Sequence, residues 1–315
     1  MGRGRDDSWD AWQTLTGVPA LDDRVLAETL DGGQAFRWQR ITVSAGGVVP
    51  PPRDQDIAWL GVWAGNVARV RLNPARQIEW SSPASLAPRI ATALADYFAT
   101  AHDFSALADT LPFRSDPHIA ACLAEFRGLR ILRQPFGETL LGFLCSATKQ
   151  IVQIKQMLAL LAARHGREIV PGVHALPTWL ELAAIPEATL RACLLGFRAK
   201  FIHQTARFLA AHPGWLEETE TLPYAAAKAR LCSLPGVGEK IADCVLLFGA
   251  GRLEAFPVDV WILKTMAQRY GLDGWKPAQV AHFGRAHFGP LAGFAQQFLF
   301  AYERAAARKL APRQS

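Results

Sequence analysis

Near the start of the chain, hydrophobic and polar positions alternate in two short runs. The runs cover residues 57–63 and 68–72, and Gly65–Asn66 lies between them. Alternation with a period of two is typical of strands that bury one face, and a Gly-Asn pair favours a tight turn, so this segment predicts a β-hairpin. Residues 34–43 (QAFRWQRITV), rich in aromatic and β-branched side chains, predict a further strand. A loop marked by prolines, residues 46–56, separates this strand from the hairpin.

After residue 109 the hydrophobic positions recur every three or four residues, which predicts helices. The helices predicted there cover residues 136–146, 151–165, 226–233, 240–250 and 290–304. A further helical stretch, residues 86–102, flanks the β domain. Pro171, Pro177 and Pro186 divide the stretch up to residue 195 into shorter helices. We therefore predict an α+β protein, with a small N-terminal antiparallel β domain and a mostly α-helical body that contains a helix-hairpin-helix.

The same patterns divide the chain into four segments. These are an N-terminal tail (1–20), an antiparallel β domain with a flanking helix (21–108), a helical body (109–305) and a basic C-terminal tail (306–315).

The composition is that of a globular protein, and its net charge of +6 slightly favours a polyanionic partner. The five cysteines are scattered, without the spacing of a zinc or iron–sulfur site, so we expect reduced thiols and no metal. The sequence contains neither a secretory N-terminal segment nor an apolar run of about 18 residues. We therefore expect a cytoplasmic protein with no membrane partner.

The most informative motif is LPGVGEK at residues 234–240. Gly236 and Gly238 stand between two predicted helices, where a reversing chain needs positive φ or a close approach. Such a turn leaves backbone N–H groups at the start of the second helix, and these bind a phosphate well. Glycines that serve only the packing of an αα-hairpin are the alternative. A cation held by the hairpin carbonyls is a further option that the sequence leaves open.

Lys240 and Asp259 give this hairpin a chemical interpretation. Lys240 opens the second helix, whose partial positive charge favours a neutral, nucleophilic amine. Asp259 follows 19 residues later as the single carboxylate in the apolar run AFPVDVWIL. An unpaired carboxylate is unfavourable in such a setting, so it calls for a partner. The alternative role for Asp259 is the N-cap of the helix after Pro257, and the two roles are compatible.

These residues resemble the helix-hairpin-helix–Gly/Pro–Asp signature of base-excision DNA glycosylases. The chain is similar, more narrowly, to 8-oxoguanine DNA glycosylase/AP lyases of the eukaryotic type, which also occur in bacteria. The matching segments are GQAFRW (33–38), LRILRQ (129–134), FLCSATKQIVQI (143–154), GFRAK (196–200) and GPLAGFAQQFLF (289–300).

The resemblance implies an enzyme that flips a damaged nucleotide out of duplex DNA containing oxidised guanine. Lys240 would attack the sugar C1′ and form a Schiff base, Asp259 would stabilise the developing positive charge, and β-elimination would follow, without any cofactor. Formamidopyrimidines are further candidate lesions. The bacterial member would act as a monomer, associated with the nucleoid through its substrate.

The resemblance also implies a base pocket. The carbonyl of Gly33 would accept the N7–H that distinguishes 8-oxoguanine from guanine. Phe300 would stack on the base, and Gln296 would bond its pairing edge from the same helix face. Cys244 would pack on the opposite face of the base. Taken without the resemblance, Phe300 is a core residue and Cys244 a buried structural thiol.

The predicted DNA-binding residues are Gly236, Val237, Gly238, Thr148, Lys149, Phe197 and Arg198. Phe197 stands in place of the family's usual Tyr as a wedge, a side chain inserted into the duplex, and Arg198 is retained to contact the opposite cytosine. Thr148 and Gln153 depart from the Asn-rich turn and the Arg of eukaryotic members, so we predict weaker discrimination of the opposite base. Trp261 replaces a phosphate-contacting His, and we interpret it as a core residue.

Two other functions remain open. A related glycosylase for alkylated bases would use the Asp without a lysine at the hairpin, so Lys240 counts against it. A non-catalytic helix-hairpin-helix DNA-binding protein would need neither Lys240 nor Asp259. Borohydride trapping separates that protein from the predicted enzyme, because a mere binder forms no reducible adduct.

Overall fold

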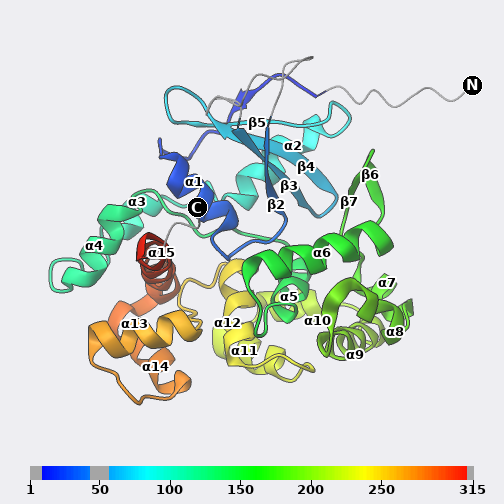
Figure 1. The fold of residues 1–315 in the computed structure, drawn as a ribbon. Coiled ribbons are helices and arrows are strands. Elements are labelled where there is room, and N and C mark those ends of the chain that lie inside the picture. Colours follow the sequence, from blue (N-terminus) through cyan, green and yellow to red (C-terminus); the bar gives the residue numbers. More distant parts are fainter. Residues whose placement is uncertain (1–8, 43–56, 311–315) are drawn as a thin grey trace, which may run out of the picture.

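The structure, a computed structural model, describes residues 9–42 and 57–310. The β-sheet with α1 (Asp23–Asp31) and α2 (Ala87–Tyr97) lies above a larger layer of helices (Figure 1). The sheet is antiparallel, in the order β1-β5-β4-β3-β2. Its strands are β1 (Gln13–Thr14), β2 (Trp38–Thr42), β3 (Ile57–Trp63), β4 (Asn66–Leu72) and β5 (Ile78–Ser81). The predicted α+β architecture is confirmed.

The predicted hairpin forms, with its turn one residue earlier than expected. Trp63 pairs with Asn66, so Ala64 and Gly65 make the turn and Asn66 begins β4. Both turn residues have positive φ, 44° and 73°, as the two-residue turns that match the twist of a sheet require. The Ala64 N–H donates to Glu138 Oε1 at 2.9 Å, which ties the hairpin to the helical body.

Other boundaries also differ from the prediction. β2 begins at Trp38 rather than residue 34, because the buried Gln34 amide bonds to the backbone of residues 130–132 instead of pairing in the sheet. The predicted helix over 86–102 ends at Tyr97. The predicted loop at 46–56 lies outside the described residues.

The ends of the chain carry more structure than the predicted tails. Within the segment 1–20, β1 pairs with the edge of β5, and Leu15 and Val18 are buried. α15 (Ala292–Leu310) continues past residue 305. In the N-terminal segment, apolar side chains and the free edge of the sheet gain partners that the local sequence does not show.

The helical body begins with α3 (Phe104–Ala108) and α4 (Pro117–Glu125). It continues with α5 (Phe136–Leu144), α6 (Ile151–His165), α7 (Trp179–Ala184), α8 (Glu187–Leu190), α9 (Arg198–Ala211) and α10 (Trp215–Thr221). The helix-hairpin-helix is α11 (Tyr224–Cys232) with α12 (Glu239–Phe248), followed by α13 (Val260–Tyr270) and α14 (Pro277–Phe288). A short hairpin, β6 (Glu168–Val170) with β7 (Val173–His174), was not predicted.

One hydrophobic core runs from the sheet into the helical body, with Trp38 and Phe98 on one side and Phe256 and Phe298 on the other. This continuity fixes the sheet layer against the helices that carry the site. Among the described residues, no helix has the length and apolar character needed to cross a membrane.

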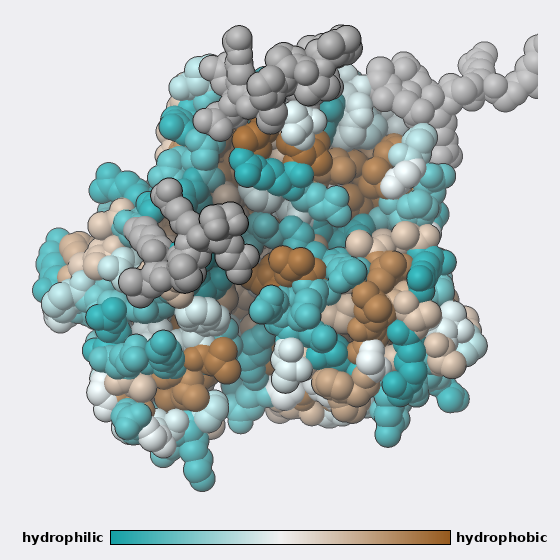
Figure 2. Space-filling view, in the orientation of Figure 1, coloured by the Kyte–Doolittle hydropathy of each residue, from teal (hydrophilic) through white to brown (hydrophobic). Residues whose placement is uncertain are grey.

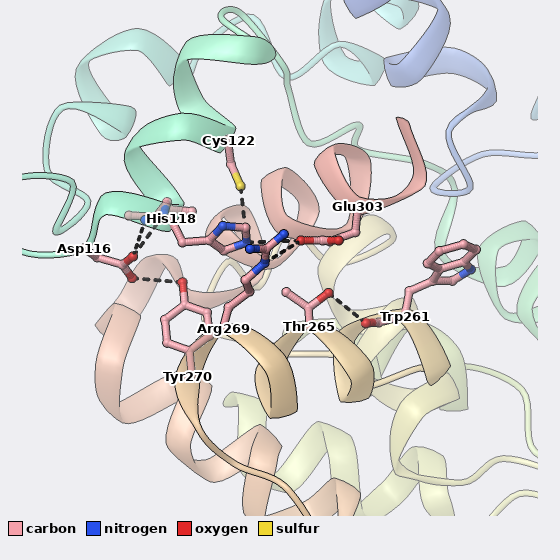
Figure 3. Close-up of polar contacts among 9 residues, drawn as sticks. Asp116, His118, Cys122, Trp261, Thr265, Arg269, Tyr270 and Glu303 are labelled. Atoms are coloured by element: carbon pink, nitrogen blue, oxygen red, sulfur yellow. Dashed lines mark hydrogen bonds and ion pairs between the residues drawn. The ribbon is translucent and has the colours of Figure 1, made fainter. Parts of the chain in front are cut away.

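A buried polar network joins α4 to α13 and α15 (Figure 3), and His287 extends it to α14. Asp116 caps α4, accepting hydrogen bonds from the backbone N–H groups of His118 and Ile119. Its second oxygen is 2.9 Å from the Tyr270 hydroxyl and 3.0 Å from His287 Nε2. Hydrogen bonds to a buried carboxylate hold helices in register, so this network fixes α13, whose first turn carries the site.

Candidate active site

The turn of the helix-hairpin-helix leaves an open helix N-terminus. Gly236 has a φ of 78°, and a Cβ there would meet the Phe201 ring at 2.6 Å, so only glycine fits. Gly238 caps α12 without a side-chain hydrogen bond, and a Cβ there would meet nothing within 4 Å. The side chain of Val237 is buried, and its N–H donates to the Leu234 carbonyl at 3.1 Å within the turn. This geometry suits a phosphate oxygen at the first N–H groups of α12.

Lys240 lies half-buried in the first turn of α12. Its Nζ is 3.4 Å from Ser146 Oγ and 5.3 Å from the centroid of the Phe143 ring. Cys244, one turn later, contacts the same lysine, and burial raises the pKa of its thiol to about 12. A thiol with that pKa stays protonated near neutral pH, so Cys244 is not an activated nucleophile.

Asp259 is the N-cap of α13, because its Oδ1 accepts a hydrogen bond from the Ile262 N–H at 2.9 Å. The predicted capping role is therefore confirmed. Burial raises the pKa of Asp259, while the hydrogen bond from Ile262 and the charge of Lys240 oppose this rise. Because the carboxylate caps α13 and also feels the charge of Lys240, capping does not exclude a catalytic role.

A single pocket brings together the residues predicted for catalysis and for the base, which are Lys240, Asp259, Gly33, Cys244, Gln296 and Phe300. They come from α12, from the start of α13, from the turn after α1 and from α15. Gly33 has a φ of 110°, and a Cβ there would lie 3.5 Å from Phe300 Cε1. The glycine therefore lets the main chain approach the aromatic ring closely.

Two amide groups of this pocket have unused hydrogen-bonding capacity. Gln296 Oε1 and Gln297 Nε2 are buried, and neither has a hydrogen-bond partner in the described part of the chain. Leaving a buried amide atom unpaired is unfavourable by about 1–3 kcal/mol, and such atoms often mark a place where a ligand binds. A purine edge, which carries both donors and acceptors, has the chemistry to pair with them.

A second group of predicted residues lies at the turn after α5. Thr148 and Lys149 are exposed, and Thr148 has a positive φ of 55°. Arg198 lies beneath the turn, only 2% exposed, and donates to the Ala147 carbonyl and to Thr148 Oγ1. In this position the guanidinium supports the turn, so its contact with an opposite cytosine stays a prediction.

The predicted wedge, Phe197, is 52% exposed. It follows a π-helical turn (Arg191–Leu195), in which Leu194 has a φ of 62° and is 53% exposed. A leucine in the left-handed region is strained, and strain of this kind gathers at functional sites. Leu194 and Phe197 are therefore two exposed apolar side chains shortly before Arg198, and exposure of this kind suits the wedge predicted for Phe197.

The interpretation of Trp261 as a core residue was wrong. Trp261 is half-buried at the start of α13 and belongs to neither hydrophobic cluster among the described residues (Figure 3). Its neighbour Val260 is 78% exposed, and Figure 2 shows an apolar patch over the end of α13 that lies next to α12. The N-cap at Asp259 directs these two residues outward, which a hydrophobic pattern alone does not reveal.

Residues 20–140 match the family model for the N-terminal domain of 8-oxoguanine DNA glycosylase. The N-glycosylase/DNA lyase OGG1 of Arabidopsis thaliana is 30% identical over 303 residues, covering 90% of this chain and 79% of the relative. The chain belongs to this glycosylase/lyase family. The predicted family and enzyme class are confirmed, whereas the roles of individual residues stay predictions.

Solved structures agree with this family. The 8-oxoguanine glycosylase/lyase of Clostridium acetobutylicum, in complex with duplex DNA, matches with a TM-score of 0.79 at 26% identity, over 95% of this chain and 99% of that chain. Its apo form gives a TM-score of 0.75 at 28% identity, over 88% and 92% of the two chains.

Several site residues of this family member were not singled out from the sequence. Ser146 and Phe143 contact Lys240 from α5 and the turn after it, and Gln297 stands beside Gln296 on α15. The paired glutamines in an otherwise apolar helix were the available signal for Gln297. Nothing local marks Ser146, because its contact with Lys240 spans 94 positions.

We predict that Asp243→Ala destabilises this enzyme strongly. Asp243 on α12 is 1% exposed and accepts hydrogen bonds from Lys228 Nζ at 2.9 Å and from Tyr224 at 2.6 Å, both on α11. Removing it takes away the buried partner of the largely buried Lys228 and leaves only the exposed Glu239 carboxylate near that charge, so the free energy of unfolding should fall by about 3–5 kcal/mol. Urea denaturation measures this loss.

Glu239→Ala is the matched control. Glu239, on the same helix, lies 3.4 Å from the same lysine, but its side chain is 60% exposed. Its removal should lower the free energy of unfolding by less than about 1 kcal/mol. Equal losses of unfolding free energy in the two variants would contradict the prediction that the hydrogen bonds between Asp243 and α11 stabilise the fold.

Proposed function

We propose that this protein excises 8-oxoguanine from duplex DNA and then cleaves the resulting abasic site by β-elimination. The observation that carries this proposal is the single pocket in which Lys240 and Asp259 meet Gly33, Gln296 and Phe300. A non-catalytic DNA-binding module needs no such pocket behind its hairpin. The two solved structures of the Clostridium acetobutylicum enzyme, an 8-oxoguanine glycosylase/lyase, support the same lesion class.

In the proposed reaction, the neutral amine of Lys240 attacks C1′ of the flipped nucleotide while the bond from C1′ to the base breaks. The base leaves with the bonding electrons and takes up a proton, and the ionised Asp259 stabilises the positive charge that develops on the sugar. Loss of a proton and opening of the sugar give the imine between Lys240 and C1′. Removal of a C2′ proton then expels the 3′ phosphate.

The DNA is proposed to bind as a duplex along the hairpin, with a phosphate at the first N–H groups of α12. Thr148, Lys149 and Phe197 would meet the strand opposite the lesion. Because the hairpin, the lysine and the pocket all come from one chain, we propose that the enzyme acts as a monomer.

Incubation with borohydride tests this function. Duplexes carrying 8-oxoguanine, guanine or a 3-alkyladenine opposite the normal partner are mixed with the protein, and covalent complexes are counted on a denaturing gel. We expect a complex with 8-oxoguanine and none with guanine. Parallel reactions without borohydride measure the bases released from the same duplexes. Base release from the alkylated duplex alone would favour the alternative glycosylase, and release from no duplex would favour the DNA-binding module.

We predict weak discrimination of the opposite base. Thr148 carries a single hydroxyl, and the Gln153 amide is engaged with the Gln150 N–H at 3.1 Å. Each missing bidentate pair removes about 1–3 kcal/mol of discrimination, so excision rates opposite the four bases should lie within roughly tenfold. Single-turnover rates on four duplexes measure this spread.

Thr148→Asn is the matching variant. Asparagine tolerates the positive φ of residue 148 better than threonine and adds an amide donor and acceptor. We expect it to fold normally and to increase the preference for cytosine. A wild-type preference for cytosine above about 100-fold would contradict the prediction of weak discrimination. A preference of that size requires at least one side chain that makes two hydrogen bonds to the opposite base.

A further inference from the structure

The end of α1 is tied to α15 by a buried ion pair. Arg304 Nη1 lies 2.8 Å from Glu28 Oε1, and both side chains are less than a tenth exposed. The same nitrogen donates to the carbonyl of Gly32, the residue at which α1 ends. Figure 1 shows α15 beside α1, so the pair joins the first and last helices of the fold. A cation that binds the last carbonyls of a helix is favourably placed with respect to the helix dipole.

The Arg304 guanidinium contacts two parts of the chain that form the pocket. Gly32, whose carbonyl it binds, directly precedes Gly33, which lines the pocket. The Arg304 Cζ also lies 5.1 Å from the centroid of the Phe300 ring, a distance at which a cation attracts an aromatic face. One side chain therefore contacts both the turn that carries Gly33 and the ring that faces it.

The turn leaves little freedom on either side of Gly33. A Cβ on Gly32 would lie 2.4 Å from Glu28 Oε1, so only glycine lets the Glu28 carboxylate reach Arg304. On the other side, the Gln34 amide is fully buried and bonds to the Arg130 carbonyl and the Leu132 N–H, each at 2.9 Å. Gly32 is therefore a contact point of the ion pair as well as the end of α1.

We propose that Arg304 and Glu28 are positioning residues for lesion recognition. They hold the Gly33 carbonyl and the Phe300 ring at the separation that a flipped 8-oxoguanine occupies. This role rests on the proposed function and deepens it, because Gly33 and Phe300 read the base while Lys240 acts on the sugar. Weakening the pair should therefore harm base recognition and leave the sugar chemistry intact.

The test compares two substrates of the same enzyme. In Arg304→Gln, single-turnover excision of 8-oxoguanine should fall by about 10- to 100-fold, since a misplacement of about 1 Å reduces rates on this scale. Cleavage of a duplex with a preformed abasic site should stay within about twofold of wild type, because that substrate has no base to recognise. The control is Arg269→Gln, which removes an arginine whose side chain is 49% exposed and pairs with Glu303 on α15, away from the pocket lining. It should leave both rates unchanged.

A double variant separates positioning from stability. Arg304→Gln alone leaves a buried carboxylate unpaired, which lowers the melting temperature. Glu28→Leu combined with Arg304→Met removes both charges and should restore the melting temperature close to that of wild type. The Gly32 carbonyl still lacks its donor, so we expect slow excision and normal abasic-site cleavage.

Wild-type excision by the double variant would overturn the positioning role, and so would a parallel loss of both activities in it. The wild-type protein reports on the proposed function in the same assay. If wild type releases no 8-oxoguanine, both proposals fail. If wild type is active and the Arg304 variants are equally active, only the positioning role fails.

Discussion

Lys240→Gln should abolish the covalent complex with borohydride and lower the release of 8-oxoguanine by roughly 10³-fold or more. The amide of glutamine has no nucleophilic nitrogen, so neither the imine nor the β-elimination that depends on it can form. The substitution keeps a polar chain of similar length near Ser146 Oγ, which lies 3.4 Å from the native Nζ. Folding and DNA binding should therefore persist, which gel-shift titration with the lesion duplex measures alongside trapping.

Lys264→Gln is the control for charge. Lys264 is exposed on α13 and does not line the pocket. Its removal changes the net charge by the same amount, and trapping should continue at the wild-type rate. A Lys240→Gln protein that still forms a reducible complex would show that another amine is the nucleophile and would remove Lys240 from the mechanism.

Asp259→Asn should lower the rate of base excision by about 10²- to 10⁴-fold without destabilising the fold. Asparagine is as good an N-cap as aspartate, and its oxygen can accept the hydrogen bond from the Ile262 N–H. What it lacks is the negative charge that faces Lys240 and the sugar. Asp259→Ala should lose the charge and also the cap, lowering the free energy of unfolding by about 1 kcal/mol.

The pH dependence of excision gives the same residue an independent test. Burial raises the pKa of Asp259, so protonated carboxyl persists to a higher pH than for an ordinary aspartate. The ionised form is the active one, so wild-type excision should rise with pH through that raised pKa. Asp259→Asn should lack this rise. An Asn variant with wild-type rate and the same pH profile would assign Asp259 to capping alone.

Much of the fold followed from local patterns. The alternating runs gave the β3–β4 hairpin, and the spacing of apolar residues gave α6 at its observed bounds, Ile151–His165. The predicted element boundaries were wrong where a side chain bonds to a segment that is distant in the sequence. Gln34 bonds to the backbone of residues 130–132, and the chain there does not enter the sheet, although its composition favours a strand.

The sequence by itself predicted the chemistry of the site. A glycine turn, a lysine at the start of the next helix and a carboxylate in an apolar run are local features, and each has a physical reason that can be stated without coordinates. The resemblance added Gly33, Cys244, Gln296 and Phe300, and the pocket contains all four.

Only the tertiary structure decided how these residues are supported. Arg304 and Glu28 are 276 positions apart, and each by itself resembles any solvated charge on a helix. Trp261 looks like a core residue in its apolar run, yet the cap at Asp259 sets the direction of the first turn of α13 and leaves it half-buried. Contacts of this kind depend on where packed helices bring distant segments together, and hydrophobic periodicity identifies the buried face of a helix but not the residue that it meets.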